Sequence, residues 1–212
     1  MPVSKEEDAR REAAGHYLLD ARQHIRAARR CSDDGLFWDT KSGRGKLASF
    51  LVVACECLLK GAAARFDESG GNVADIVWSL KALNHNLANL LIRVESTAIH
   101  ASAKEAFREL VSLFPEGVRV DLRYTIEAWA FYEDVEDDQP NAYYQTIGND
   151  SWHNEVERRI GELLGHPDLH CEGEIVTASD IDLDDLFTPR VKWTVQLDEA
   201  KSRAKARNAK RG

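Results

Sequence analysis

Residues 46–66, KLASFLVVACECLLKGAAARF, decide the fold class of this chain. Apolar residues recur there at spacings of three and four, which predicts a helix; they are Leu47, Phe50, Leu51, Ala54, Leu58, Ala62 and Phe66. Val52, Val53, Cys55 and Cys57 make its other side apolar as well. A helix that is apolar nearly all round lies at the centre of a domain or at a subunit interface.

Amphipathic segments on both sides extend the helical pattern. A first helix is expected to end near Arg29 and Arg30, and others are expected over residues 73–83, 87–94 and 103–114 and from about Asp150 to Leu164. Gly165 and Pro167 follow the last helix in the order that is typical of a helix stop. Residues 41–46, KSGRGK, lack the spacing of a phosphate-binding loop and are interpreted as a linker.

The composition changes near the C-terminus. Residues 168–189 contain seven acidic residues and no lysine or arginine, and apolar and polar residues alternate over 191–197. The alternation favours a strand with one solvated face. We therefore expect an all-α antiparallel helical bundle in residues 1–166 and a small acidic appendage of weak β character in residues 167–212.

The charge distribution limits the classes of partner. The formal net charge of −8 argues against a general nucleic-acid binder, because phosphate is repelled on average. From Asp198 onward, six basic and two acidic residues give +4 and leave −12 on residues 1–197. Such a basic tail can contact RNA, a membrane surface or an acidic partner, and the alternative is a solvated terminus.

The sequence predicts a cytoplasmic protein outside the membrane. The first residues, MPVSKEED, carry acids where a secretion signal needs bases and an apolar run. The most apolar stretch, residues 47–59, is about thirteen residues long and is interrupted by Glu56, whereas a spanning helix needs roughly twenty.

No metal or cofactor is expected. Cys55 and Cys57 are one residue apart on a predicted helix and do not face each other. His166, His170 and Cys171 lie close together in sequence but lack the paired spacing of structural zinc sites. The sequence also has no nucleophile elbow, no His-Glu-x-x-His motif and no dinucleotide fingerprint.

Three short segments together resemble the HEPN family, the higher-eukaryote and prokaryote nucleotide-binding helical domains. The first is Cys55-Glu56-x-Leu58-Leu59-Lys60-Gly61, the second is Leu83-Asn84-His85-Asn86-Leu87-x-x-Leu90-Leu91, and the third is the pair Arg123-Tyr124. The resemblance covers roughly residues 5–165. It implies a structural role for His85, Asn86, Leu87, Arg123 and Tyr124. Asn86 stands where the family more often has Asp, and Asn can still cap a helix.

Active members of that family are metal-independent ribonucleases with an Arg-x(4–6)-His motif. Histidine transfers protons near neutral pH, and arginine holds a phosphate and stabilises its developing charge. Four pairs fit this spacing: Arg10 with His16, Arg11 with His16, Arg93 with His100, and Arg159 with His166. Arg93 and His100 are the best placed, because Ser96 and Thr97 between them allow a polar pocket.

The sequence leaves three functional hypotheses. The first is a non-catalytic HEPN-like interaction protein, expected to be a homodimer, with another protein as a further candidate partner. The resemblance implies a setting of bacterial stress response, toxin–antitoxin pairs or phage defence. The second is an endoribonuclease that uses Arg93 and His100, with RNA guided by the basic tail. The third is a helical scaffold unrelated to the family.

Overall fold

Every regular element of the described chain is helical. The computed structural model describes residues 5–33, 39–68, 72–114 and 145–169. The elements in these ranges are α1 (Lys5–Asp33), α3 (Lys41–Arg65), α4 (Val73–Ala82), α5 (Leu87–Glu95), α6 (Ala101–Ser112), α9 (Asp150–Leu164) and the short 3-10 helix η2 (Pro167–Leu169). The prediction of an all-α fold is confirmed for these residues.

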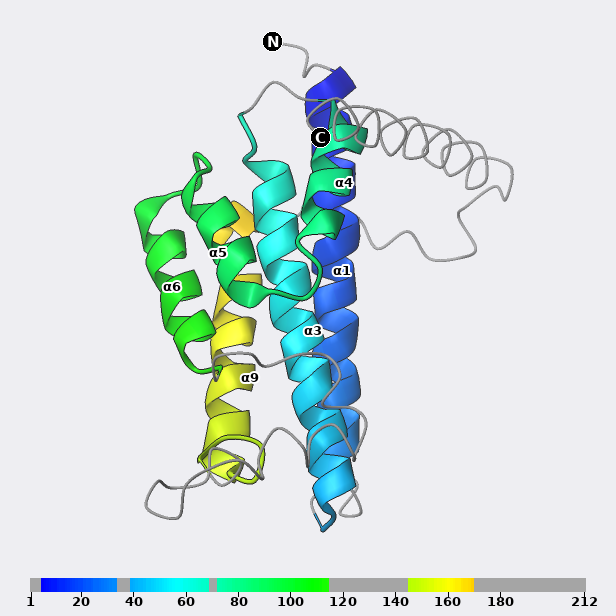
Figure 1. Cartoon of the computed structure of the whole chain (residues 1–212), viewed down its shortest axis with the longest axis vertical. Helices are drawn as coiled ribbons and strands as arrows, with labels where there is room; N and C mark the ends of the chain where they lie inside the picture. Colours follow the sequence, from blue (N-terminus) through cyan, green and yellow to red (C-terminus); the bar gives the residue numbers. More distant parts are fainter. Residues whose placement is uncertain (1–4, 34–38, 69–71, 115–144, 170–212) are drawn as a thin grey trace, which may run out of the picture.

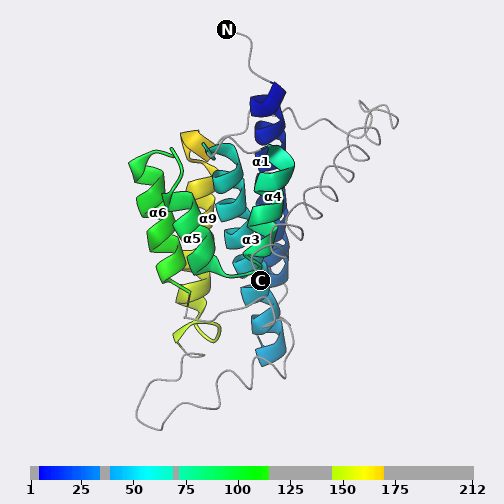
Figure 2. The ribbon, with the colours of Figure 1, turned by 45° about the horizontal axis from the view of Figure 1, so that its top comes forward.

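Two long helices form the axis of the molecule. Figure 1 shows α1 and α3 side by side and running in opposite directions, with α4 beside α1 and with α5, α6 and α9 grouped on the other side of α3. The turned view in Figure 2 keeps the same grouping. Because α3 contacts α1, α4, α5, α6 and α9, it is the central helix of the described part of the chain.

One apolar cluster joins the six α-helices of the described ranges. Its fully buried large side chains include Leu18, Leu58, Leu80, Leu90, Phe107 and Ile160. At Gly61 a Cβ atom would lie 3.0 Å from two side-chain carbons of Leu18. The absence of a side chain at Gly61 therefore lets α1 approach α3 closely, and this contact fixes the pair that the other helices cover.

The interpretation of residues 41–46 as a linker is wrong. These residues form the first turns of α3, which begins at Lys41 instead of Lys46. Thr40 caps the helix, because its side-chain oxygen accepts a hydrogen bond from the Gly43 backbone N–H at 3.0 Å. Gly43 and Gly45 are buried, so their lack of a side chain allows packing at a point where glycine is a poor helix former.

The earlier start also changes the length argument about membranes. Gly43–Arg65 is long and apolar enough to cross a bilayer by length and composition alone. Of its most apolar window, 89% is buried by the rest of the chain, as in the core helix of many globular domains. One helix of this kind is weak evidence for either environment.

Several predicted features lie outside the described residues. They are the alternating segment 191–197, the pair Arg123 and Tyr124, the residues His170 and Cys171 that were considered as metal ligands, and the basic tail. The predicted helices over 73–83, 87–94 and 103–114 correspond to α4, α5 and α6, and the last predicted helix corresponds to α9.

Candidate functional site

Two buried charged residues of α3, Glu56 and Lys60, meet the exposed His85, and we call these three residues the buried triad after the first two. Glu56 and Lys60 are on α3, and as whole residues they are only 5% and 9% exposed. The Lys60 ammonium donates to Oε1 of Glu56, and Nδ1 of His85 lies 2.7 Å from its Oε2. Both carboxylate oxygens of Glu56 are therefore used, each by a side chain that can donate to it.

Local sequence explains how the buried triad forms. Glu56 precedes Lys60 by four residues, the spacing that places two side chains on one helix face in the favourable order. His85 comes from the turn between α4 and α5. Asn84 bends that turn with a left-handed φ of 52°, and Asn86 ends it by accepting a hydrogen bond from the Asn89 backbone N–H at 3.0 Å. Two asparagines thus fix the backbone on either side of His85.

Two neighbours of the buried triad remain protonated at neutral pH. Burial raises the pKa of Tyr17 to about 12, and the nearby Cys57, Glu56 and Asp20 add to that rise. Burial likewise raises the pKa of Cys57 to about 12, with Glu56 and Asp20 contributing. A thiol in this state is a poor nucleophile, because the thiolate is the reactive form.

Arg93 is held by an internal carboxylate. Its guanidinium forms an ion pair with Asp67, which follows α3 and whose side chain is 3% exposed. Arg10 of α1 reaches the same residue and donates to the Asp67 backbone carbonyl at 2.6 Å. Asp67 therefore links the ends of α1 and α5 to the end of α3, and this contact occupies the cation of the candidate Arg93–His100 pair.

His100 caps α6 and lies beside a second histidine. Its Nδ1 accepts from the Ser102 backbone N–H at 3.3 Å and is 2.8 Å from the Ser102 hydroxyl. Nε2 of His166 is 3.3 Å from that same hydroxyl. A carboxylate oxygen of Asp168 accepts from the His100 backbone N–H at 3.2 Å. This group connects the start of α6 to the segment after α9.

The structure does not join the arginine and histidine of any candidate pair through a polar contact between described side chains. Arg93 and His100 have the separate partners given above. Arg11 pairs with Glu7 at 2.8 Å, and His16 lies 4.0 Å from Glu12. What the fold brings together instead is His100 with His166, one histidine from each of two different pairs.

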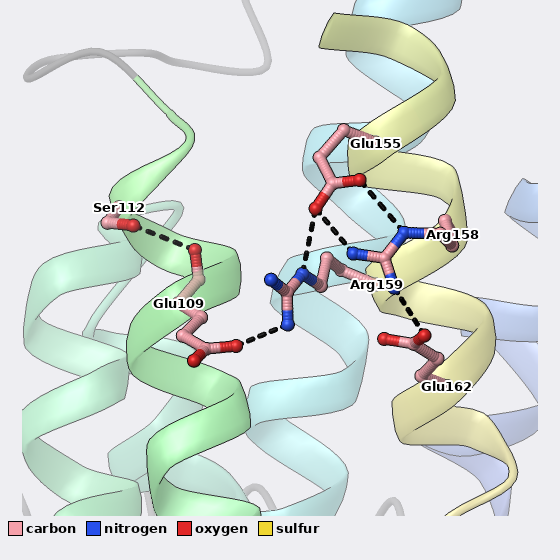
Figure 3. Close-up of polar contacts among 6 residues, drawn as sticks. All are labelled: Glu109, Ser112, Glu155, Arg158, Arg159 and Glu162. Carbon is pink, nitrogen blue, oxygen red and sulfur yellow. Dashed lines mark hydrogen bonds and ion pairs between the residues drawn. The ribbon is translucent and has the colours of Figure 1, made fainter.

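Arg159, the partner of His166 in sequence, belongs to a charged array between α6 and α9. We call Glu109, Glu155, Arg158, Arg159 and Glu162 the surface ladder (Figure 3). Arg159 pairs with Glu109 of α6 and, at 2.9 Å, with Glu155 of its own helix. Hydrogen bonds from Arg158 and Arg159 lower the pKa of Glu155 to about 2.

Sequence reasoning missed the buried triad and the two-histidine group. The Glu56–Lys60 half had a signal, since an acid and a base four residues apart interrupt an otherwise apolar helix. The contacts of His85 with Glu56 and of Ser102 with His166 join residues 29 and 64 positions apart. No local pattern carries that information.

Within the described ranges, no three His, Cys, Asp or Glu side chains are grouped so that they could hold a metal ion.

Comparison with known proteins adds no assignment. No family model, no curated protein and no solved structure matches the chain.

Proposed function

We propose that this chain is a non-catalytic, HEPN-like helical interaction protein that acts as a homodimer in bacterial stress response, a toxin–antitoxin pair or defence against phage. The observation that carries the proposal is the engagement of Arg93 and His100 in separate internal contacts. Arg93 is paired with the buried Asp67, and His100 caps α6. A ribonuclease that used this pair would need both side chains at one phosphodiester.

The residues behind the HEPN resemblance support a scaffold role. The Glu56 carboxylate contacts both the Lys60 ammonium and the His85 imidazole, and Asn86 caps α5. Leu87 is buried in the apolar cluster. The His85–Glu56 contact holds the turn between α4 and α5 on α3, and the Asn86 cap fixes where α5 begins, as expected of residues that maintain a binding surface.

The proposal is tested by assaying RNA cleavage and mass together. The purified full chain is incubated in EDTA with several RNAs, and its mass is measured by light scattering after gel filtration. We expect no cleavage and a mass near twice 23.8 kDa. Metal-independent cleavage that is lost in His100→Ala, or a monomer at all concentrations, contradicts the proposal.

Two exposed side chains are the first positions to probe at a subunit interface. Leu19 on α1 and Ile92 on α5 are 44% and 64% exposed and are the large exposed apolar residues in the described ranges. Leu19→Glu and Ile92→Glu are expected to leave helicity unchanged. Whichever of them converts the dimer to a monomer locates the interface.

RNA cleavage is the second candidate, and one observation favours it. The imidazoles of His100 and His166 both reach the Ser102 hydroxyl, so two groups of a type that can transfer protons lie near one oxygen atom. His100→Asn provides the matched control for His100→Ala, because asparagine still caps a helix but does not transfer protons. Cleavage lost in both variants supports catalysis, whereas cleavage lost only in His100→Ala supports a role in capping.

A further inference from the structure

We propose that Nε2 of His85 is a phosphoryl-acceptor site, positioned by the Glu56 carboxylate and able to form N-phosphohistidine with a donor such as an acyl phosphate or a phosphoramidate. The inference goes beyond the interaction role above and does not depend on it. It starts from the buried triad, which combines an exposed imidazole with a carboxylate that the fold has buried.

The contact with Glu56 determines the tautomer of His85. Glu56 is paired with the Lys60 ammonium, so it is a carboxylate and can only accept. The ring nitrogen that lies 2.7 Å from Oε2 is Nδ1, and it must therefore donate. In the neutral imidazole the proton is then on Nδ1 and the lone pair is on Nε2.

A phosphoryl donor from solvent can reach the His85 side chain. The His85 side chain is 56% exposed, whereas that of Glu56 is 6% exposed. The contact thus occupies Nδ1, while more than half of the His85 side chain stays exposed to solvent. A carboxylate that accepts from one ring nitrogen fixes the tautomer and the orientation of the imidazole.

Phosphoryl transfer to His85 exchanges one bond to phosphorus for another. The Nε2 lone pair forms the new N–P bond, and the bond from phosphorus to the donor's leaving atom breaks with its electron pair remaining on that atom. Nδ1 keeps its proton, so the ring becomes an imidazolium. Its positive charge lies beside the Glu56 carboxylate, which stabilises it, and no other proton has to move.

His16 is the internal control for this site. It is on α1, its side chain is 69% exposed, and its Nε2 faces the exposed Glu12 at 4.0 Å. It therefore offers an accessible imidazole without a buried carboxylate on Nδ1. If exposure alone governed reactivity, His16 would react at least as fast as His85.

The experiment uses potassium phosphoramidate, which transfers its phosphoryl group to imidazole nitrogen and releases ammonia. The full chain is labelled in its folded state and in urea, and peptide mass spectrometry at alkaline pH measures the rate at each histidine. We expect His85 to be labelled about tenfold faster than His16 in the folded chain, and the ratio to fall to about one in urea. A ratio near one in the folded chain overturns the proposal.

The positioning role of Glu56 has its own test. The double variant Glu56→Gln with Lys60→Met removes both charges, and its fold is checked by circular dichroism. We expect the labelling ratio of His85 to His16 to fall toward one while helicity is retained; an unchanged ratio contradicts the role of Glu56. Nitrogen NMR of the wild-type imidazole should also show the Nδ1–H tautomer at His85, and the Nε2–H tautomer would contradict the argument without any substitution.

Discussion

The buried triad and the surface ladder use the same chemistry in opposite surroundings. Each pairs carboxylates with cations, but the side chains of Glu56 and Lys60 are 6% and 11% exposed, whereas those of Glu109 and Arg159 are 45% and 30% exposed. A buried charge that loses its partner keeps its full desolvation cost, while an exposed charge is rehydrated. The comparison teaches that burial, more than the number of ion pairs, decides which pair the fold depends on.

The main contact between α9 and the end of α6 is made by Trp152, not by the surface ladder. Trp152 of α9 donates from its indole N–H to the Leu113 carbonyl at 2.6 Å and meets Phe114 edge to face at 5.7 Å between ring centroids. These contacts are largely buried and combine apolar area with a satisfied donor. The charged array of Figure 3 adds one ion pair between the same two helices, from Arg159 of α9 to Glu109 of α6.

The largest effect is expected from breaking the buried triad at one end. Lys60→Ala leaves the Glu56 charge buried with only His85 as a partner, and we expect the free energy of unfolding to fall by about 3–5 kcal/mol. Urea unfolding followed by circular dichroism measures the change. The double variant Glu56→Gln with Lys60→Met is the control and should lose much less, because no unpaired charge remains. A loss below about 1 kcal/mol for Lys60→Ala would show that the pair is effectively solvated.

The next comparison is between two glycines, Gly61 beside the buried triad on α3 and Gly161 beside the surface ladder on α9. Alanine is the better helix former at both Gly61 and Gly161. At Gly61 the new Cβ would lie 3.0 Å from Leu18, so we expect Gly61→Ala to destabilise the fold by about 1–3 kcal/mol. At Gly161 on α9 nothing lies within 4 Å, so Gly161→Ala should stabilise by up to about 1 kcal/mol. The same unfolding curves test both, and equal signs would contradict the difference in packing.

Acidification provides a third comparison, through a buried histidine near the ladder. Burial lowers the pKa of His153, whose Nε2 lies 2.8 Å from the backbone carbonyl oxygen of Ile147. As the pH falls, the unfolded chain therefore binds a proton at His153 at a higher pH than the folded chain does. Stability from this group is complete above the ordinary pKa of about 6.5 and is lost as the pH falls from there toward the lowered folded value. Unfolding free energies between pH 7.5 and 5 should fall less steeply in His153→Gln than in the wild type, and equal slopes would exclude His153 as the cause.

The smallest effect is expected from the surface ladder. Glu109→Gln removes the ion pair with Arg159 between α6 and α9, and we expect a loss below about 1 kcal/mol. The difference from wild type should shrink further in high salt, because exposed pairs are screened. A larger loss that persists in high salt would mean that the ladder joins the helices in the way the buried triad does.

Much of the fold was accessible from local pattern. The spacing of apolar residues located α4, α5, α6 and α9, and the Gly165–Pro167 stop marked the end of α9. The start of α3 was missed because Gly43 and Gly45 are poor helix formers by propensity; both are buried in the folded chain, and the Thr40 cap lies directly before them. The candidate pair Arg93 and His100 was chosen by its spacing and by the polar residues between its members, and neither feature carries information about Asp67 or Ser102.

The sequence by itself determined that this chain forms helices, because a periodicity of three and four is a property of neighbouring residues along the chain. It also supplied Glu56 and Lys60 as a pair, since four residues on a helix bring side chains together without any help from the rest of the fold. Only the tertiary structure decided that His85 completes that pair and that His100 lies beside His166. Such contacts depend on how α3, α4, α5, α6 and α9 pack, and packing is set by the shape of the whole apolar cluster.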